Sequence, residues 1–266
     1  MNNPITLEWD EPWRETETFL RLLRGPRFAA PPTDEHGIAI RGYCTTINRE
    51  PFLRDHPKMR VDLGDPDDRE NVARRIWRDA RPAYVGVLLC RIDQATEWRR
   101  RRDNGKAFPV AFYRRTNAHV EYRQALWCDI VGSDVGEQIQ RLRDFAVHPT
   151  MLVWSGHLSL HAYWILERPV TDRAFRRLMP ALCAQLRGNR RAISPMQQMR
   201  LPGGVHERTG ARASLVLAGE RYYRAGQVAR AITVSDGEVE AYFGHPRPAA
   251  RSARAAAAPA RGVMSA

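Results

Sequence analysis

Apolar and polar residues follow two different spacings along the chain, one typical of strands and the other of helices. Alternation over Ile38–Ile47 predicts a strand, as do the apolar runs Tyr84–Leu89 and Leu126–Val131. Met151–Trp154 and Leu160–Leu166 predict two more strands, which the short segment SGHLS joins. The sequence therefore predicts a hairpin in the middle of the chain.

Helical spacing separates these strands. Apolar residues at intervals of three and four predict amphipathic helices, and a further helix ending at Leu186 can be capped by Thr171 or Asp172. Strands and helices are mixed without strict alternation, which favours an α+β fold. Besides the helix that ends at Leu186, the predicted elements are helices over Glu15–Leu23, Asp68–Ala80 and Val135–Phe145, and a short last strand over Leu215–Leu217.

Composition adds a strong positive charge to this picture. The 266 residues are 43% hydrophobic, enough for a substantial core, and carry a net charge of +12 with a pI near 10.3. Such a surplus is typical of proteins that bind polyanions, because each neutralised phosphate releases counterions. The alternative is a soluble protein whose arginines reflect the composition of its genome. Residues from about 246 to 266 contain no acidic side chain and predict a disordered basic tail.

Several classes of protein lack support in the sequence. No two of the four cysteines form a CxxC pair, so a structural zinc site is not expected, and scattered thiols fit a reducing compartment as small core residues. Glu8, Asp10 and Glu11 lie where a signal peptide is apolar. No run approaches the ~20 apolar residues that span a bilayer. We expect a cytoplasmic protein with no membrane partner.

The turn between the two central strands can serve as a phosphate-binding segment. Gly156 lets the backbone approach a ligand, Ser155 and Ser159 offer hydroxyl groups, and a protonated His161 can face phosphate oxygens. The alternative is an ordinary hairpin whose histidine is satisfied within the core.

Two other segments carry side chains suited to the same chemistry. Asp129 ends an apolar strand, where burial is costly unless the carboxylate binds metal or a partner; capping of the following helix is an equal alternative. Arg200 precedes a Pro-Gly-Gly turn and is either a bidentate phosphate clamp or a surface arginine. A cluster of Trp98 with Arg99, Arg100, Arg101 and Arg102 can grip single-stranded nucleic acid by stacking and charge.

The order of these segments resembles RepB-type DNA primases, which belong to the archaeo-eukaryotic primase, or primase-polymerase, superfamily. The matching positions are Asp129, then Ser155-Gly156 through His161-Ala162-Tyr163-Trp164, then Arg200-Leu201-Pro202-Gly203, and the resemblance covers roughly residues 80–220. It implies an α+β core with a mixed or antiparallel sheet flanked by helices. The expected division is an N-terminal extension (1–79), a primase-polymerase-like domain (80–225) and a C-terminal segment (226–266).

The chain departs from the family pattern at two places. The family has two aspartates at i and i+2 in the first motif, where strand alternation puts both on one face for metal binding, but here the second position is Val131. The family also has an acidic residue before the Arg-Pro-Gly turn, whereas Asn189–Gln198 contains none. Asp134 is the candidate substitute metal ligand.

The resemblance implies a nucleotidyltransferase that primes or assists DNA replication of a plasmid, phage or integrated element. Asp129 then holds Mg²⁺ or Mn²⁺ with Asp134, and Asp129 and His161 form the catalytic pair on neighbouring strands. Ser155, Gly156, Ser159, His161 and Arg200 bind the nucleoside triphosphate. Two alternatives stay open: an inactive primase-fold accessory protein that binds DNA or nucleotide, favoured by the missing carboxylates, and an unrelated nucleic-acid-binding module.

Overall fold

The structure is a computed structural model. It describes residues 9–26, 43–48, 59–91, 99–103, 106–110, 120, 122–132, 134–195 and 197–244. The predicted basic tail and Trp98 lie outside these residues.

Two antiparallel sheets form the centre of the described part of the chain. The first has strand order β10-β3-β1-β2, and β4 also pairs with β1. The second has order β11-β8-β9-β7, so β9 lies between two partners and β7 lies at an edge. A separate pair, β5 (Arg99–Asp103) and β6 (Lys106–Val110), forms a small hairpin. The strands of the two larger sheets are β1 (Tyr43–Asn48), β2 (Met59–Asp62), β3 (Tyr84–Gly86), β4 (Cys90–Arg91), β7 (Arg123–Ile130), β8 (Met151–Trp154), β9 (Leu160–Val170), β10 (Gln198–Arg200) and β11 (Ser214–Ala218).

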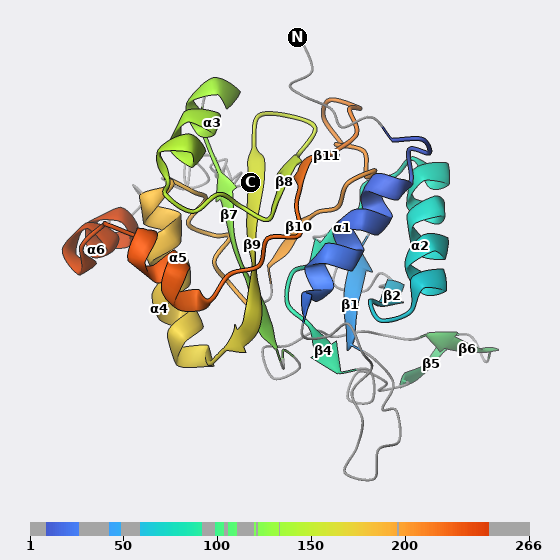
Figure 1. Cartoon of the computed structure of the whole chain (residues 1–266). Coiled ribbons are helices and arrows are strands. Elements are labelled where there is room, and N and C mark those ends of the chain that lie inside the picture. The colour runs from blue at the N-terminus through green and yellow to red at the C-terminus, as the bar shows by residue number, and fades with distance from the viewer. Residues whose placement is uncertain are drawn as a thin grey trace, which may run out of the picture.

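Six helices in the described residues flank these sheets. Figure 1 shows α1 and α2 on one side of β9, and α3, α4, α5 and α6 on the other. Three of them begin at side-chain caps, since Asp65, Asp134 and Thr171 accept hydrogen bonds from the N–H groups of the first turns of α2, α3 and α4. The helices are α1 (Arg14–Arg24), α2 (Pro66–Asp79), α3 (Val135–Asp144), α4 (Asp172–Gln185), α5 (Ala225–Ala231) and α6 (Asp236–Gly244).

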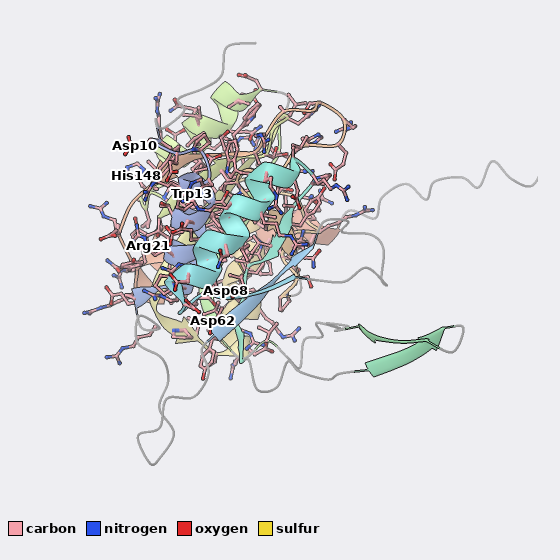
Figure 2. All side chains as sticks on the ribbon, turned by 90° about the vertical axis from the view of Figure 1, so that its right-hand side faces the viewer. Asp10, Trp13, Arg21, Asp62, Asp68 and His148 are labelled. Carbon is pink, nitrogen blue, oxygen red and sulfur yellow. The ribbon has the colours of Figure 1, made fainter. Side chains whose placement is uncertain are left out.

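The two N-terminal helices pack against each other, and α1 also packs against β11 of the second sheet, whereas α2 packs against β2 of the first sheet. Arg74 of α2 stacks 4.0 Å above the Trp13 ring, and Arg69 donates to Glu17, so the helices run antiparallel. They lie side by side in both views, with Trp13 and Asp68 labelled in Figure 2. Phe19 of α1 meets the Tyr163 ring of β9 edge-on at 5.2 Å. The described parts of the 1–79 segment therefore share one hydrophobic core with the central strands, while the domain boundaries themselves stay a prediction.

The α+β fold class is confirmed, and the hairpin of β8 and β9 lies where the sequence placed it. One predicted strand is too long, because β3 ends at Gly86 and the predicted strand reached Leu89. Residues 87–89 are fully buried although they are not in a strand, and Leu89 is tied to Tyr122 by an isolated bridge. Burial explains their apolar character without strand pairing beyond that bridge.

The cysteine and membrane expectations can be compared with the described residues. Cys128 and Cys183 are free, buried thiols, as predicted for small core residues, while the side chains of Cys44 and Cys90 lie outside what the structure describes. No helix in the described part of the chain has both the length and the apolar character needed to cross a bilayer.

Candidate functional site

Asp129 and His161 lie directly opposite each other on β7 and β9, as the sequence predicted. They are register partners, and His161 Nε2 lies 3.5 Å from Asp129 Oδ1. Their side chains are nearly buried, with exposed fractions of 9% for His161 and 15% for Asp129. The next pair on the same face of these two strands is Trp127 with Tyr163, so the Tyr163 ring continues this face of the sheet toward α1.

Burial dominates the electrostatics of this pair. It lowers the pKa of His161; the Asp129 carboxylate opposes this effect, and Arg200 adds to it. The sequence led us to expect a protonated His161, but in the structure its imidazole favours the neutral form, because desolvation penalises the charge. Three buried polar atoms here have no hydrogen-bond partner among the described residues: Asp129 Oδ1, His161 Nδ1 and the Tyr163 hydroxyl.

Asn189 supplies the hydrogen bonds that hold Asp129. The Asn189 side-chain amide donates to Asp129 Oδ2 at 3.0 Å, and the Asn189 backbone N–H donates to the Asp129 carbonyl at 2.7 Å. Tyr242 of α6 fixes the preceding residue by donating to the Gly188 carbonyl at 2.5 Å. Because an amide donor does not ligate a cation through its N–H, this side of the carboxylate is occupied by a hydrogen bond rather than open to metal.

The donor set does not fit a pair of divalent ions. Val131, at the family's second aspartate position, is 39% exposed and carries no ligand atom. Asp134 instead caps α3 by accepting from the Glu137 N–H. In the described ranges, no three histidine, cysteine or acidic side chains gather closely enough to hold an ion. Asp129 and His161 are too few ligands for the oxygen-rich coordination that Mg²⁺ requires.

The turn between β8 and β9 is tightly held. The Ser155 N–H donates to the Ser159 carbonyl at 3.0 Å, and Trp154 Nε1 donates to the His157 carbonyl at 2.8 Å. From α3, the buried Gln138 accepts from the Leu160 N–H and donates to the Leu158 carbonyl. Helix α3 therefore fixes the turn that carries the two serines.

The Arg-Leu-Pro-Gly segment places Arg200 inside the protein, at the end of β10. Its exposed fraction is 8%, and its Nη2 donates at 2.8 Å to both Glu207 Oε2 and the Tyr84 hydroxyl. Its guanidinium also stacks 4.6 Å above the Tyr84 ring, which excludes the surface-arginine alternative. Burial and the hydrogen bond to Glu207 raise the pKa of Tyr84 to about 12. For Glu207, burial acts to raise the pKa, but hydrogen bonds from Tyr84, the backbone and Arg200 lower it overall.

A histidine pair joins the two turns. The rings of His157 and His206 are stacked, with centroids 5.2 Å apart and planes 19° apart. Gly156 has a φ of +84°, and an added Cβ there would lie 2.9 Å from the Ala211 carbonyl oxygen, so glycine permits this close approach. Thr209 Oγ1 donates to the Gly156 carbonyl at 2.7 Å.

Positive groups converge on His206. Burial lowers its pKa most, and Arg200, His157 and Arg208 lower it further by charge repulsion, while Glu207 opposes them. The Arg208 N–H donates to His206 Nδ1, so Nε2 is left to carry the ring proton. A group of cationic and donor side chains that repel one another is an arrangement that an anion stabilises. Sequence reasoning did not assign a role to His157 or His206, although His157 lies within the Ser155–Ser159 turn and His206 follows the Pro-Gly-Gly turn.

The basic segment is not brought into this site by any described contact. Arg99–Asp103 form β5, which pairs with β6 alone. Figure 1 shows this hairpin apart from the two larger sheets. The structure describes the backbone of Arg99–Arg102 and not the side chains, so their proposed role in binding nucleic acid stays a prediction.

No family model and no curated protein matches the chain. Among solved structures, the archaeo-eukaryotic primase domain of the cyanophage S-2L primase-polymerase matches at 18% identity and a TM-score of 0.50, covering 73% of this chain and 91% of that one. The primase RepB′ matches at 7% identity and a TM-score of 0.48 over 88% of this chain and 62% of that one. The RepB′ catalytic domain in complex with initiator DNA matches at 10% identity and 0.48, over 88% and 100%. The match to the cyanophage domain shows that the chain has the primase-polymerase fold.

Proposed function

We propose that this primase-polymerase-fold protein binds nucleoside triphosphate and single-stranded DNA, and assists replication of a plasmid, phage or integrated element in the cytoplasm without catalysing metal-dependent nucleotide transfer. The single observation that carries the proposal is the contrast within one site: Arg200, His157 and His206 converge, while Asp129 is held by Asn189. The replication setting rests on the resemblance of the motifs.

The converging donors suit a polyphosphate. Arg200 already donates to Glu207 and Tyr84, and a phosphate oxygen can replace the carboxylate on the same guanidinium. His206 Nε2–H adds a donor, and the serine hydroxyls of the Ser155–Ser159 turn are the further donors that we propose for the triphosphate. His161, whose pKa burial lowers, acts in this arrangement as a neutral donor rather than as a cation.

The carboxylate side supports loss of the transfer step. Nucleotide transfer needs ions that activate the attacking hydroxyl and neutralise the triphosphate. Asp129 accepts from the Asn189 amide, and its neighbours Val131 and Asp134 add no ligand to it in the described contacts. The described residues therefore supply too few ligands for the pair of ions that nucleotide transfer needs.

A second candidate is an active primase, a nucleotidyltransferase that uses Mg²⁺ or Mn²⁺. One observation favours it: Asp129 Oδ1 is buried and has no hydrogen-bond partner among the described residues, which leaves one oxygen as a potential ligand beside His161. A buried acceptor without a partner is costly, and a cation is one way to satisfy it.

The two candidates differ in a direct experiment on the full chain. Triphosphate binding is measured by calorimetry in EDTA and again with Mg²⁺ or Mn²⁺, and incorporation of ribo- and deoxynucleotides is measured on a single-stranded template. We expect binding in EDTA and no incorporation with either metal. Incorporation that needs metal and is abolished in Asp129→Asn would establish the active primase instead. A chain that binds no triphosphate under any condition would overturn the proposal.

A further inference from the structure

We propose that Thr16, Trp77 and Arg212 are positioning residues that fix Arg200 for phosphate binding through the turn that follows it. The inference rests on the proposed function, and it assigns a role to helices α1 and α2, for which the sequence indicated none. Thr16 lies on α1, Trp77 on α2, and Arg212 precedes β11.

Thr16 is the centre of the network. Its hydroxyl donates to the Pro202 carbonyl at 2.8 Å and accepts from Trp77 Nε1 at 3.1 Å. Thr16 is completely buried, so neither hydrogen bond can be replaced by solvent without movement of the helix. These bonds join three segments that are distant in sequence.

Arg212 closes the network from the other side. Its Nη1 donates to the Gly203 carbonyl at 2.9 Å and its Nη2 donates to the Trp77 carbonyl at 3.2 Å. The guanidinium also lies 4.3 Å from the centre of the Trp77 ring. Consecutive carbonyls of the turn, those of Pro202 and Gly203, are thus held by the hydroxyl of Thr16 and the guanidinium of Arg212.

The fit between the turn and the helices leaves no spare room. Gly203 has a φ of +84°, and an added Cβ would lie 2.7 Å from both Thr16 Oγ1 and Trp77 Nε1. The Gly203 N–H donates to the Ala213 carbonyl at 2.8 Å. Close packing and these hydrogen bonds hold the turn in one position, so loss of the Thr16 hydroxyl leaves the buried Pro202 carbonyl without its partner and allows the turn to move.

The turn at Pro202 and Gly203 also determines the position of the Arg200 guanidinium. Arg200 Nη1 donates at 3.1 Å to the carbonyl of Val205, which lies just after the turn. The Leu201 N–H donates to Ala83 at 2.9 Å, and the Val205 N–H donates to Arg81 at 3.1 Å. Because the Arg200 side chain is buried and anchored to the backbone beyond the turn, displacement of residues 201–205 displaces its charge.

Thr16→Val tests the network with a nearly isosteric change that removes the hydroxyl, and Thr16→Ser restores it. Thr150→Val is the matched control: Thr150 is also buried, donates to the Arg221 carbonyl at 2.7 Å and accepts from the Ile165 N–H at 3.1 Å. It precedes β8, whereas the Ser155–Ser159 turn follows that strand. Triphosphate affinity, Tm and the pKa of His206 by NMR titration are measured on each full-length variant.

We expect Thr16→Val to weaken triphosphate binding by about threefold to tenfold, the equivalent of one buried hydrogen bond. His206 should titrate at a higher pH in this variant, because Arg200 repels its proton in the wild type. Thr16→Ser should restore both values. Thr150→Val should lower Tm about as much as Thr16→Val does, but it should change neither the triphosphate affinity nor the titration of His206.

Equal losses of affinity in Thr16→Val and Thr150→Val, with the titration of His206 unchanged, would overturn the inference and leave Thr16 a structural residue. The His206 titration keeps the two proposals separate. If the wild type binds no triphosphate, the proposed function fails, and an unshifted His206 in Thr16→Val would independently show that the network does not position Arg200.

Discussion

The half of the candidate site that we propose binds phosphate, the phosphate-facing half, and the half around Asp129, the carboxylate half, are built in different ways. On the phosphate-facing side, two turns meet through a histidine stack, and α1, α2 and α3 hold them by buried hydrogen bonds. On the carboxylate side, Asp129 depends on one amide, that of Asn189, and on the facing His161. The first half is part of the packing of the core, and the second is a small set of side chains on two strands and one loop.

This difference shows which features of a fold can be lost with little effect on stability. Replacing Gly156 or Gly203 by a larger residue would push the added Cβ against neighbouring atoms, so a change in either turn would destabilise the fold. A valine at position 131 is 39% exposed and disturbs no packing. An asparagine at position 189 gives Asp129 a neutral partner. Metal ligands can therefore disappear while the phosphate-facing turns stay intact.

The largest effect is expected at Arg200. Arg200→Gln removes the cation that faces Glu207 and Tyr84, and triphosphate affinity should fall by ~2–5 kcal/mol, the usual cost of removing one partner of a buried charged contact. Arg208→Gln is the control, because Arg208 is exposed on the same loop and should cost less. Calorimetry with a triphosphate measures both. Equal losses would show that net charge, and not the buried guanidinium, carries the binding.

Glu15 makes the phosphate-facing half sensitive to pH. Burial raises its pKa from 4.5 to about 7, although the Leu215 N–H and Arg212 oppose that rise. The raised pKa in the folded state favours the protonated carboxyl. The contribution of Glu15 to the free energy of unfolding is therefore fully present below pH 4.5 and is lost as the pH rises toward 7. The expected loss is on the order of 3 kcal/mol.

Urea unfolding between pH 4.5 and 7.5 measures this loss as the difference between wild type and Glu15→Gln. The comparison removes other titrations, including that of His161, whose lowered pKa acts with the opposite sign. Parallel stability curves for the two proteins would contradict the role of Glu15.

Adding carboxylates around Asp129 should give the carboxylate half the ability to bind a divalent ion. Val131→Asp with Asn189→Asp surrounds Asp129 with acidic oxygens, and we expect Mn²⁺ affinity to rise on the order of tenfold per added carboxylate. Mn²⁺ should also raise the Tm of the variant, because the ion relieves repulsion between the carboxylates. Mn²⁺ binding is followed by calorimetry, with incorporation on single-stranded template as a second measurement.

Asp134→Asn is the matched control for this double variant. It keeps a helix-capping side chain at the start of α3, and by the described contacts it should leave Mn²⁺ affinity unchanged. A loss of Mn²⁺ binding in Asp134→Asn would indicate instead that Asp134 is a metal ligand.

The smallest effect concerns single-stranded DNA. Deleting residues 246–266 removes four arginines of the predicted tail and should weaken binding by about 1 kcal/mol at moderate salt, with a shallower dependence on salt concentration. Tm should stay constant, since the apolar side chains of the segment are mostly small alanines that have little surface to bury. Fluorescence anisotropy across a salt series measures the effect. Affinity of the full chain that does not vary with salt would show that the charge surplus reflects genome composition.

The predicted elements differ in how well local pattern determined them. Helix α2 was predicted from apolar spacing, α4 from a capping residue at Thr171 or Asp172, and β7, β8 and β9 from apolar runs. The sequence did not indicate β2, β5, β6, β10, α5 or α6. Strand β5 has the sequence RRRRD, which carries no apolar signal, and β10 is a three-residue strand. Such strands form because a neighbouring strand supplies hydrogen-bond partners.

The sequence by itself determined the α+β class and the central hairpin, because apolar periodicity and strand alternation act over a few neighbouring residues. The order of the motifs and the resemblance that they carry predicted that Asp129 and His161 lie on neighbouring strands. Tertiary structure decided the rest of the site. Asn189 lies 60 positions from Asp129, Trp77 lies 61 from Thr16, and Glu15 lies 200 from Leu215. No local pattern records such pairs, since each arises only when packing brings distant segments together and excludes the water that otherwise satisfies their polar atoms.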